Sequence, residues 1–451
     1  MISRAATLAG ATLCLACSAV ASPAAAEVIL SPALTARSGV TVTMPPAGLS
    51  VEYPVIAQAL GSGPCPPPAL VSELLQLGSP PIELGGVSQD MTMPPGALPA
   101  GPPGSWEAAI SYHLPTGFWS QMHCLLSASK DPLTVGLNMR LGSLAWATQM
   151  AGEAQAAATN GLTFSLGNEP DLYDLPNYAS LDKPLPGAEL AAANLYLQQA
   201  AYVRPALGSA AVIGPELSTP AHWRAQLPRV IAQLHPQTVG VHMYPLSVCR
   251  NAREATLSGL LSSRAANGPA RLAWVVADAR SAGLPAIVSE ANSVSCGGRA
   301  GVSDTPAAAV WAVRFVLSAL ESGFQEVRFH SSGNPYDPFL VRGAEVLVRP
   351  LGRALAALNA WLPLGATLRT VQGAPGLLTS AVAQPGGGMV LILDNESGHA
   401  RSATVRSARD VRETLVTASY GGLPSKLAHP THGRLHISVP ANSVVTILPT
   451  R

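Results

Sequence analysis

The sequence predicts an α/β fold, a (β/α)8 TIM barrel followed by an antiparallel β-sandwich domain, and three observations support this prediction. Short apolar runs alternate with longer Ala- and Leu-rich segments eight times between residues 49 and 333. No glycine-rich phosphate loop follows the first run, as a doubly wound sheet would normally require. After Trp361 apolar and polar residues alternate and the pattern breaks at Gly, Pro and Asn, which is typical of antiparallel strands.

The eight apolar runs are predicted to be the barrel strands, because they are short, apolar and β-branched in places, as strands buried on both faces should be. The segments between them carry apolar residues at helical spacing, most clearly at 188–203 and at 305–323, which ends in Gly323 as a stop signal. Repeated strand–helix alternation is the pattern of a closed barrel. The strands are expected at 49–54, 81–86, 133–139, 163–170, 210–217, 238–245, 285–293 and 326–333.

The change of pattern after Trp361 divides the chain into two expected domains. The catalytic barrel is expected at residues 47–361 and the β-sandwich at residues 362–451. Residues 27–46 precede the first barrel strand and contain the runs VIL and GVTVTM. We expect this segment to join the sandwich as one or two additional strands.

Residues 1–26 are predicted to be a cleaved signal peptide. Arg4 supplies a positive charge, an apolar stretch follows at residues 5–21, and three alanines at 24–26 form a cleavage site of the A-x-A kind. A membrane anchor and a lipoprotein attached through Cys17 are the alternatives. We expect export, to the periplasm or the medium, since no later segment offers about twenty uninterrupted apolar residues.

Composition and charge exclude some classes of partner. The chain has 451 residues, of which 48% are hydrophobic and 12% charged, so it can bury a large core. Its formal net charge is +1 and its basic residues are scattered. A function in binding nucleic acid or an anionic membrane surface is therefore not expected.

Cysteine content predicts two disulfides. Four cysteines remain after removal of the signal peptide, and an even number in an exported chain favours two bridges, with three possible connectivities. Four buried thiols are the alternative. No C-x-x-C pair with accompanying histidines remains, so a zinc site is not expected. The four residues are Cys65, Cys124, Cys249 and Cys296, and the last two follow predicted strand ends at the same face of the barrel.

Two glutamates at predicted strand ends indicate glycoside hydrolysis. Glu169 follows the fourth strand in the stretch FSLGNEPDLY, and Glu290 lies at the end of the seventh. Catalytic residues of such barrels gather at the carboxyl ends of the strands. Glycosidases need one carboxyl group as acid and a second as base or nucleophile. The alternative for Glu169 is a structural cap at the start of a helix, with Pro170 in its first turn.

An ordered set of motifs resembles known glycosidases. GLSVEY, IELGGVSQD, LTVGLNM, FSLGNEPDLY, VHMYP and SEANSVSCGGRAGVSD, spread over about residues 49–305, resemble clan A glycoside hydrolases and more closely glycoside hydrolase family 79, the β-glucuronidases and heparanases. The resemblance implies that Glu169 is the acid/base and Glu290 the nucleophile. It also implies that Asn168 holds the sugar 2-hydroxyl and that Tyr244 orients Glu290.

The same resemblance implies a site for the C6 carboxylate of a glucuronyl unit at the backbone N–H groups of Gly297 and Gly298. A simple turn is the alternative for these two glycines. Glu52, His242 and His330 also end predicted strands and are candidates for sugar contacts. The alternative for Glu52 is an ion pair with an arginine, and for each histidine a packed, hydrogen-bonded position in the core.

The expected protein is an exported retaining β-glycosidase, closest to the β-glucuronidases, acting on an oligosaccharide or glycoconjugate. Two alternatives remain, a β-glucosidase or diglycosidase of the same fold and a catalytically inactive carbohydrate-binding protein. The two-glutamate mechanism requires no metal or organic cofactor. Nothing in the sequence indicates the oligomeric state.

Overall fold

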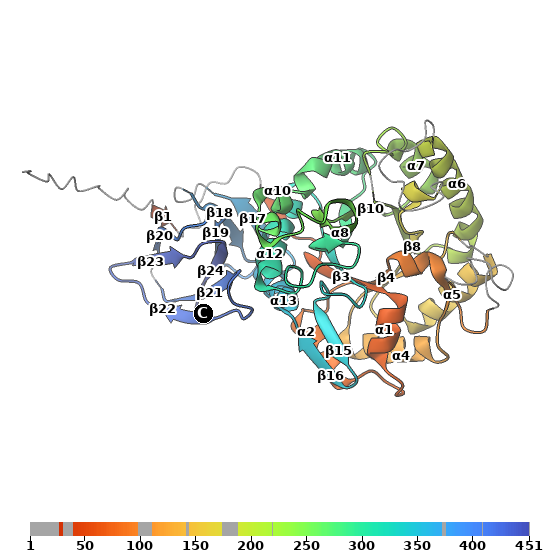
Figure 1. Ribbon diagram of the computed structural model, residues 1–451, viewed down its shortest axis with the longest axis horizontal. Coiled ribbons are helices and arrows are strands. Elements are labelled where there is room, and N and C mark those ends of the chain that lie inside the picture. The colour runs from red at the N-terminus through yellow and green to blue at the C-terminus, as the bar shows by residue number, and fades with distance from the viewer. Residues whose placement is uncertain are drawn as a thin grey trace, which may run out of the picture.

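The computed structural model describes residues 27–29, 39–97, 111–140, 144–173, 188–218, 220–371, 376–407 and 409–450. A helix-covered barrel and a smaller β-domain lie side by side, with helices α12 and α13 between them (Figure 1). The predicted signal peptide lies outside the described residues. Within them, no helix combines the length and the apolar character needed to cross a bilayer.

Eight parallel strands close into a barrel, and each follows its neighbour in chain order. This confirms the predicted fold class. The strands are β3 (Ala47–Glu52), β4 (Ile82–Gly85), β7 (Leu133–Leu137), β8 (Leu162–Leu166), β9 (Ala211–Leu217), β10 (Thr238–Met243), β12 (Ala286–Ala291) and β14 (Val327–Ser331). Except for β3 and β9, the strands end two or more residues, or in β4 one residue, before the predicted runs, because the chain turns away at the mouth of the barrel. β3 is as long as its run but begins two residues earlier, and β9 ends where its run ends.

The long helices cover the outside of the barrel. Helix α12 begins with Pro306 in its first turn, where the missing N–H costs nothing, and ends two residues before Gly323, which has a φ of +95°. It is buried all round because the sandwich covers the side that faces away from the barrel. The helices are α1 (Tyr53–Leu60), α2 (Pro68–Gln76), α4 (Phe118–Ser129), α5 (Leu144–Ala157), α6 (Ala188–Val203), α7 (Leu227–Leu234), α11 (Ala273–Ser281), α12 (Pro306–Glu321) and α13 (Pro350–Trp361).

Several shorter elements decorate the barrel. Three short helices follow the sixth strand, and the 3-10 helices Val87–Met91, Pro170–Leu172, Arg204–Leu207 and Pro269–Leu272 lie in other loops. The short helices are α8 (Val248–Asn251), α9 (Leu257–Leu260) and α10 (Ser263–Ala266). Three two-stranded pairs complete the loops: β5 (Thr92–Met93) with β6 (Tyr112–His113), β11 (Leu246–Ser247) with β13 (Val294–Ser295), and β15 (Phe339–Arg342) with β16 (Glu345–Val348).

Two sheets form the sandwich and enclose a separate apolar core. Buried and exposed residues alternate along a strand such as β23, as expected where one face packs and the other is solvated. This confirms the predicted C-terminal β-domain. The larger sheet holds β2 (Val40–Thr41), β17 (Thr367–Thr370), β18 (Leu378–Ala383), β19 (Met389–Asn395), β24 (Ser443–Pro449), β21 (Val411–Thr417) and β22 (Ser425–Ala428), and the smaller holds β1 (Glu27–Ile29), β20 (Arg401–Arg406) and β23 (Arg434–Val439).

A buried ion pair joins the barrel to the sandwich. Arg314 of α12 donates from Nη2 and Nε to Oδ1 of Asp394 in β19, at 2.8 and 2.9 Å. Its remaining donors reach the carbonyls of Leu261 at 3.2 Å and Asn395 at 2.9 Å. Burial raises the pKa of Asp394 to about 6 even though Arg314 opposes the shift. All three nitrogens of the guanidinium therefore donate at this interface.

Both predicted disulfides are present. Cys65 is bonded to Cys124, which ties the loop between α1 and α2 to α4. Cys249 is bonded to Cys296, which links the loops that follow the sixth and seventh barrel strands. One bridge therefore stabilises the side of the barrel, and the other lies at its mouth.

Candidate active site

The site lies at the carboxyl ends of the barrel strands, where five titratable side chains converge from five strands or their ends. Two of them, His242 and Glu290, are direct partners in the pairing of β10 with β12. A register shift between Val241 and His242 produces this pairing. Such irregularities commonly re-aim a side chain near functional sites. The others are Glu52 at the end of β3, Glu169 beyond β8, and His330 in β14.

Glu169 and Glu290 approach each other closely. One oxygen of each carboxylate and one ring nitrogen of His242 lie within 4.8 Å of one another. The two carboxylates keep limited contact with solvent, since their side chains are 15% and 9% exposed. Both are therefore accessible to a substrate without being fully hydrated.

The backbone at Glu169 adopts a left-handed conformation, with φ of 50° and ψ of 54°. Such a conformation is uncommon for a residue other than glycine and persists where the surroundings enforce it. Glu169 stands directly before the 3-10 helix Pro170–Leu172, yet its side chain makes no capping hydrogen bond. It turns instead toward His242, so the alternative of a structural helix cap does not describe this residue.

His242 lies between the two glutamates. Its Nδ1 is 3.1 Å from Oε1 of Glu169 and 3.9 Å from Oε2 of Glu290. Burial lowers the pKa of His242, but the charge of Glu290 and the contact with Glu169 outweigh burial and raise it to about 10. Burial likewise raises the pKa of Glu169, but the hydrogen bond and charge of His242 lower it overall. In the resting site the proton therefore resides on His242.

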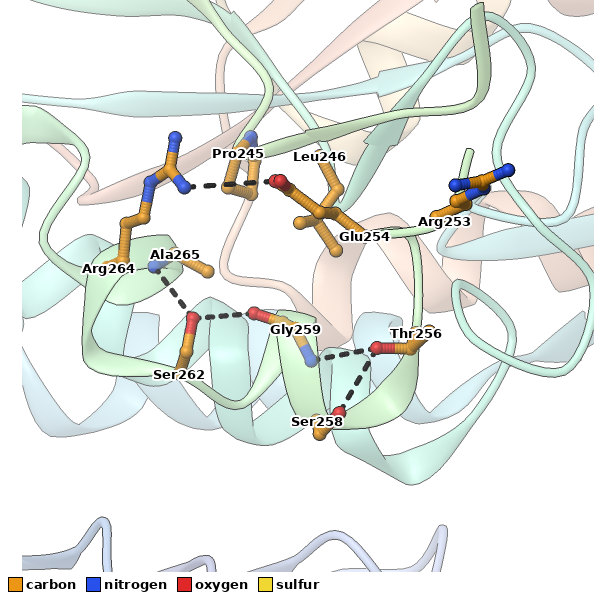
Figure 2. A pocket seen from close by; sticks show the side chains of 10 residues that line it. All are labelled: Pro245, Leu246, Arg253, Glu254, Thr256, Ser258, Gly259, Ser262, Arg264 and Ala265. Carbon is orange, nitrogen blue, oxygen red and sulfur yellow. Dashed lines mark hydrogen bonds and ion pairs between the residues drawn. The ribbon is translucent and has the colours of Figure 1, made fainter. Parts of the chain in front are cut away.

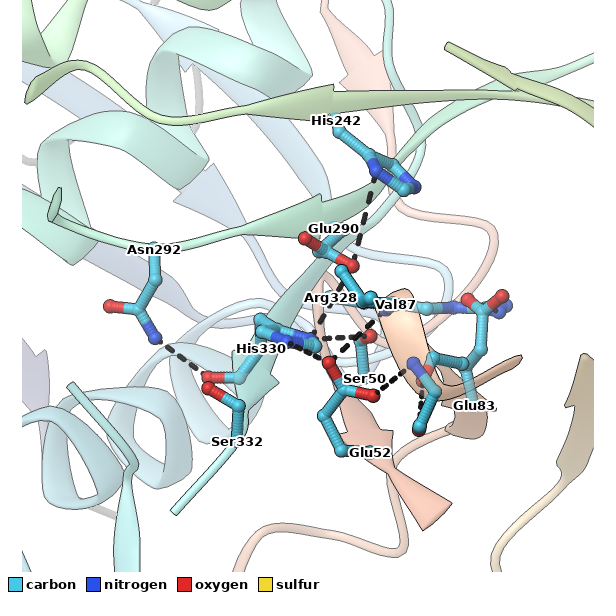
Figure 3. Close-up of polar contacts among 12 residues, drawn as sticks. Ser50, Glu52, Glu83, Val87, His242, Glu290, Asn292, Arg328, His330 and Ser332 are labelled. Atoms are coloured by element: carbon cyan, nitrogen blue, oxygen red, sulfur yellow. Dashed lines mark hydrogen bonds and ion pairs between the residues drawn. The ribbon is translucent and has the colours of Figure 1, made fainter. Parts of the chain in front are cut away.

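Glu290 lies between two imidazoles, those of His242 and His330 (Figure 3). Tyr244 donates its hydroxyl proton to Oε1 of Glu290 at 2.7 Å. Nδ1 of His330 is 3.4 Å from Oε2 of the same carboxylate. These contacts fix the orientation of Glu290 from three directions.

Glu52 is anchored by backbone rather than by an arginine. Its two oxygens accept from the N–H groups of Val87 at 3.1 Å and Ser88 at 2.7 Å. Its Oε1 is also 3.4 Å from Nε2 of His330. Burial lowers the pKa of His330, but the charge of Glu290 and the contact with Glu52 raise it to about 9. His330 thus bridges Glu52 and Glu290 across the floor of the site, and Ser50 contacts its Nδ1 at 3.1 Å.

Asn168 is buried beside Glu169 and holds one free polar atom. Among the described residues its Oδ1 has no hydrogen-bond partner. Its backbone N–H donates to Asp90, which also accepts from the N–H of Met139 and the hydroxyl of Tyr173. Sequence reasoning did not single out Asp90. Its place in the motif IELGGVSQD, directly after the second strand, is the signal that could have found it.

The segment Cys296-Gly297-Gly298 has three successive left-handed residues, with φ of 62°, 90° and 75°. Within the described part of the chain, the N–H groups of the two glycines donate to no protein acceptor. The bridge from Cys249 and the short pairing of β11 with β13 hold this segment at the rim. The two amides are therefore available to a ligand.

Tyr336 is a site residue that sequence reasoning missed. Its ring centroid lies 6.3 Å from that of Tyr244 and 6.0 Å from that of His330. A Cβ placed on Gly298 would lie 3.0 Å from its Cδ1, so glycine is required for this close approach. It comes from an irregular loop after the eighth strand, where no sequence pattern marks it.

The trio of Glu169, His242 and Glu290 is also the one group among the described residues whose geometry could hold a metal ion. A metal would need the lone pair of Nδ1 of His242. Without a metal the two carboxylates favour the charged imidazolium, so the same three groups are also arranged for proton transfer.

A pocket of about 410 Å³ lies in the segment that follows β10 (Figure 2). It begins at Pro245, directly after Tyr244, and is lined otherwise by residues of the 246–265 segment. Arg264 and Glu254 form an exposed ion pair across it at 3.7 Å. Neither Glu169 nor Glu290 lines it, so the pocket is separate from the carboxylate pair.

No family model and no curated protein matches the chain. Several solved structures share its fold. A 4-O-α-L-rhamnosyl-β-D-glucuronidase from Fusarium oxysporum 12S, solved as a Rha-GlcA complex, is 18% identical with a TM-score of 0.69, and the match covers 93% of this chain and 100% of that one. The fold is that of known glycoside hydrolases.

Two further structures extend this likeness. A GH51 arabinofuranosidase from Xanthomonas axonopodis pv. citri is 13% identical with a TM-score of 0.63, covering 92% of this chain and 98% of its own. A GH30 endoxylanase from Clostridium papyrosolvens C71 is 13% identical with a TM-score of 0.58, covering 94% and 100%. These matches support the clan A type of fold, and membership of family 79 stays a prediction.

Proposed function

We propose that the protein is a retaining β-glycosidase of the β-glucuronidase type. The observation that carries this proposal is the close approach of Glu169 and Glu290, within 4.8 Å, at the ends of the fourth and seventh strands. Carboxyl groups of retaining enzymes stand about 5–5.5 Å apart, whereas those of inverting enzymes stand about 6.5–9.5 Å apart to admit a water molecule. The spacing favours direct attack by one glutamate on the sugar.

In this mechanism Glu290 attacks C1 of the sugar and forms a covalent glycosyl-enzyme, while Glu169 gives a proton to the leaving oxygen. The proton comes from His242. Its transfer from Nδ1 to Oε1 of Glu169, across 3.1 Å, leaves a neutral imidazole and a protonated carboxyl group. In the second step Glu169 removes a proton from water, which attacks C1 and releases the sugar with retained configuration.

Sugar recognition is assigned to the groups around this pair. The free N–H groups of Gly297 and Gly298 support the binding of a C6 carboxylate, because successive backbone N–H groups in a turn form an anion-binding nest. The free Oδ1 of Asn168 supports a contact with the 2-hydroxyl. Glu52 and His330 are assigned to the remaining hydroxyl groups, and the solved Fusarium neighbour, a rhamnosyl-glucuronidase, supports the choice of sugar.

One observation favours a second candidate, a β-glucosidase or diglycosidase. Three carboxylates, those of Glu52, Glu169 and Glu290, lie in the site against two imidazoles. An uncharged sugar would avoid repulsion from this excess of negative charge. The diglycosidase alternative has a separate support, because the Fusarium neighbour is named a 4-O-α-L-rhamnosyl-β-D-glucuronidase.

We also propose that the protein is exported, to the periplasm or the medium. Two disulfides support this location, because such bonds persist in oxidising compartments. The test is the mature N-terminus of the secreted protein, which should begin near Glu27. A protein that still carries residues 1–26 would contradict the cleavage of a signal peptide.

The decisive experiment on the proposed function is release of 4-nitrophenol from its β-glucuronide and its β-glucoside, measured with EDTA present. Hydrolysis of the glucuronide supports the full assignment, including the nest. Hydrolysis of the glucoside alone would support the catalytic roles of the two glutamates and contradict the proposed binding site for a C6 carboxylate. If folded protein cleaves neither of these, nor a rhamnosyl-glucuronide, the glycosidase proposal is wrong.

A further inference from the structure

A second carboxyl cluster lies inside the barrel, directly beneath the site. Glu216 of β9 is completely enclosed there. Its Oε2 accepts a hydrogen bond from Ser165 of β8, while among the described residues its Oε1 has no partner. The negative charge of Glu83 in β4 also acts on Glu216. A carboxyl group beside a like charge favours its protonated form.

The arginine that pairs with Glu83 is shared with a second carboxylate. Arg328 of β14 donates from Nη1 to Glu83 at 2.8 Å and from Nε to Glu326 at 3.0 Å, so its charge is divided between those two carboxylates (Figure 3 shows Arg328 beside Glu83). Burial first, and the charge of Glu83 second, raise the pKa of Glu216 to about 8. Near neutral pH Glu216 is therefore a neutral acid.

The strand register places Glu216 under His242. Glu216 is the partner of Gly240 in the pairing of β9 with β10, His242 follows Gly240 by two residues, and Glu216 and His242 act electrostatically on each other. A Cβ at Gly240 would lie 2.9 Å from Cγ of Glu216, so the glycine is what admits the carboxyl group here. The charge of Glu216 acts on His242 directly and favours its protonated form.

The groups that face Glu216 come from every element around it. Glu83 and His242 are the titratable groups named above, and Tyr196 of α6 approaches from the helix side. Two hydroxyls complete the shell, Ser165 and Ser289, and the latter has no hydrogen-bond partner among the described residues. Asp90, Arg328 and Glu326 are the further charged groups of this interior.

We propose that Glu216 is a positioning residue for acid/base catalysis, which as a neutral acid lets His242 release its proton to Glu169. The proposal rests on the proposed glycosidase function. Glu216 cannot contact the sugar directly, because it is buried beneath His242 and between the strands around it. Its proposed role is therefore an effect on His242.

The proposal fixes the sign of a pH effect. When Glu216 loses its proton, a negative charge appears beneath His242 and holds the proton on the imidazole. Glu169 then stays anionic and cannot protonate the leaving oxygen. The activity is therefore expected to fall as the pH rises through about 8. For a single titrating group the fall is about tenfold for each pH unit above that point.

The test compares the pH profile of kcat/KM for wild-type protein and Glu216→Gln, on whichever aryl glycoside the wild type hydrolyses, between about pH 5 and 10. The glutamine keeps the volume and stays neutral, so the alkaline limb near pH 8 should disappear and the plateau should extend by about one pH unit or more. An alkaline limb in Glu216→Gln that coincides with that of the wild type would overturn the proposal.

A matched control is Asp131→Asn. Asp131 is also a fully buried acid, whose pKa burial raises to about 7, but it precedes β7 at the opposite end of the barrel. Its profile should coincide with that of the wild type. If Asp131→Asn moves the limb as Glu216→Gln does, the limb reports the stability of the fold and the proposal is wrong.

A second readout needs no substrate. The ¹⁵N shifts of the His242 imidazole, assigned by their loss in His242→Asn, report its protonation, and His242 should titrate at a lower pH in Glu216→Gln than in the wild type. Unchanged titration overturns this inference whatever the activity. Folded wild-type protein that hydrolyses no glycoside overturns the proposed function instead, so the two failures are distinguishable.

Discussion

Two buried charge clusters in this molecule are built in opposite ways. At the interface between barrel and sandwich, Arg314 and Asp394 form a bidentate pair, and the leftover donors of the guanidinium reach backbone carbonyls. At the barrel mouth His242 stands 3.1 Å from one carboxylate and 3.9 Å from another, and serves both incompletely. In the first arrangement every nitrogen of the cation donates to a protein acceptor, whereas in the second one imidazole nitrogen faces two carboxylates.

The difference has a physical meaning. A fully satisfied buried pair is destabilising to break, because the remaining charge is left without solvent or partner. In the second cluster one imidazole keeps its proton within reach of two carboxylates, which is the arrangement that acid/base chemistry requires. Substitutions at the interface should therefore affect stability and spare chemistry, and substitutions at the mouth should do the reverse.

The largest effect is expected for Glu290→Gln. Loss of the nucleophile should lower kcat/KM by about five orders of magnitude, as found when catalytic nucleophiles are removed. The midpoint of urea unfolding should stay close to that of the wild type, because glutamine keeps the volume of the side chain and its oxygen still accepts the hydrogen bond from Tyr244. Activity assays and denaturation on the same preparation check this, and a large loss of stability would erase the contrast between the two clusters.

Glu169→Gln is expected to have the next largest effect. Removal of an acid/base group lowers the rate by about 10²- to 10⁴-fold. The loss should be much smaller for a 2,4-dinitrophenyl leaving group than for 4-nitrophenyl, because a better leaving group needs less protonation. Measuring kcat/KM on both substrates checks this. Equal losses on the two would assign Glu169 a role other than acid.

Arg314→Met should show the reverse behaviour. Breaking the pair leaves Asp394 buried without its cation and should cost about 3–5 kcal/mol of folding free energy. Below the unfolding transition, kcat/KM should remain close to that of the wild type. Urea unfolding measures the loss, and the double variant Arg314→Met with Asp394→Leu is the control. It should recover part of the stability, since an apolar pair tolerates burial.

The smallest effect is expected at the rim disulfide. Cys249→Ser combined with Cys296→Ser frees the segment that carries Gly297 and Gly298, so KM for a glucuronide should rise by about three- to tenfold while kcat changes little, a loss of up to about 1.4 kcal/mol. The matched control is the pair Cys65→Ser and Cys124→Ser, on the side of the barrel. If KM changes by a similar factor in both double variants, the segment with Gly297 and Gly298 does not bind the substrate.

The sequence predicted the fold well because local patterns determine it. All eight barrel strands lie within one or two residues of a predicted run at their start, and α6 occupies the predicted residues 188–203. The disulfides could be counted but not assigned, since their pairing depends on which loops meet at the mouth. Strand ends also placed Glu169 and Glu290 on one face, which brought them forward as candidates before any distance was known.

The interior polar network was beyond sequence reasoning. Glu83 stands in an apolar run and Arg328 in another, 245 positions away, and only the closure and stagger of the barrel bring them to 2.8 Å. The position of Glu216 beneath His242 likewise depends on the register of β9 and β10, and on the space left by the missing side chain of Gly240. Tyr336 enters from an irregular loop. Each of these contacts is long-range, and none leaves a periodic signal in the chain.

The most direct test of the two-glutamate account is trapping of the covalent intermediate. The protein would be incubated with a 2-deoxy-2-fluoro-β-glycosyl fluoride of the sugar that it hydrolyses, digested, and analysed by mass spectrometry. The account predicts one added glycosyl group on the peptide that contains Glu290, and none in Glu290→Gln. A glycosyl group on another carboxylate, or inactivation without any adduct, would contradict it.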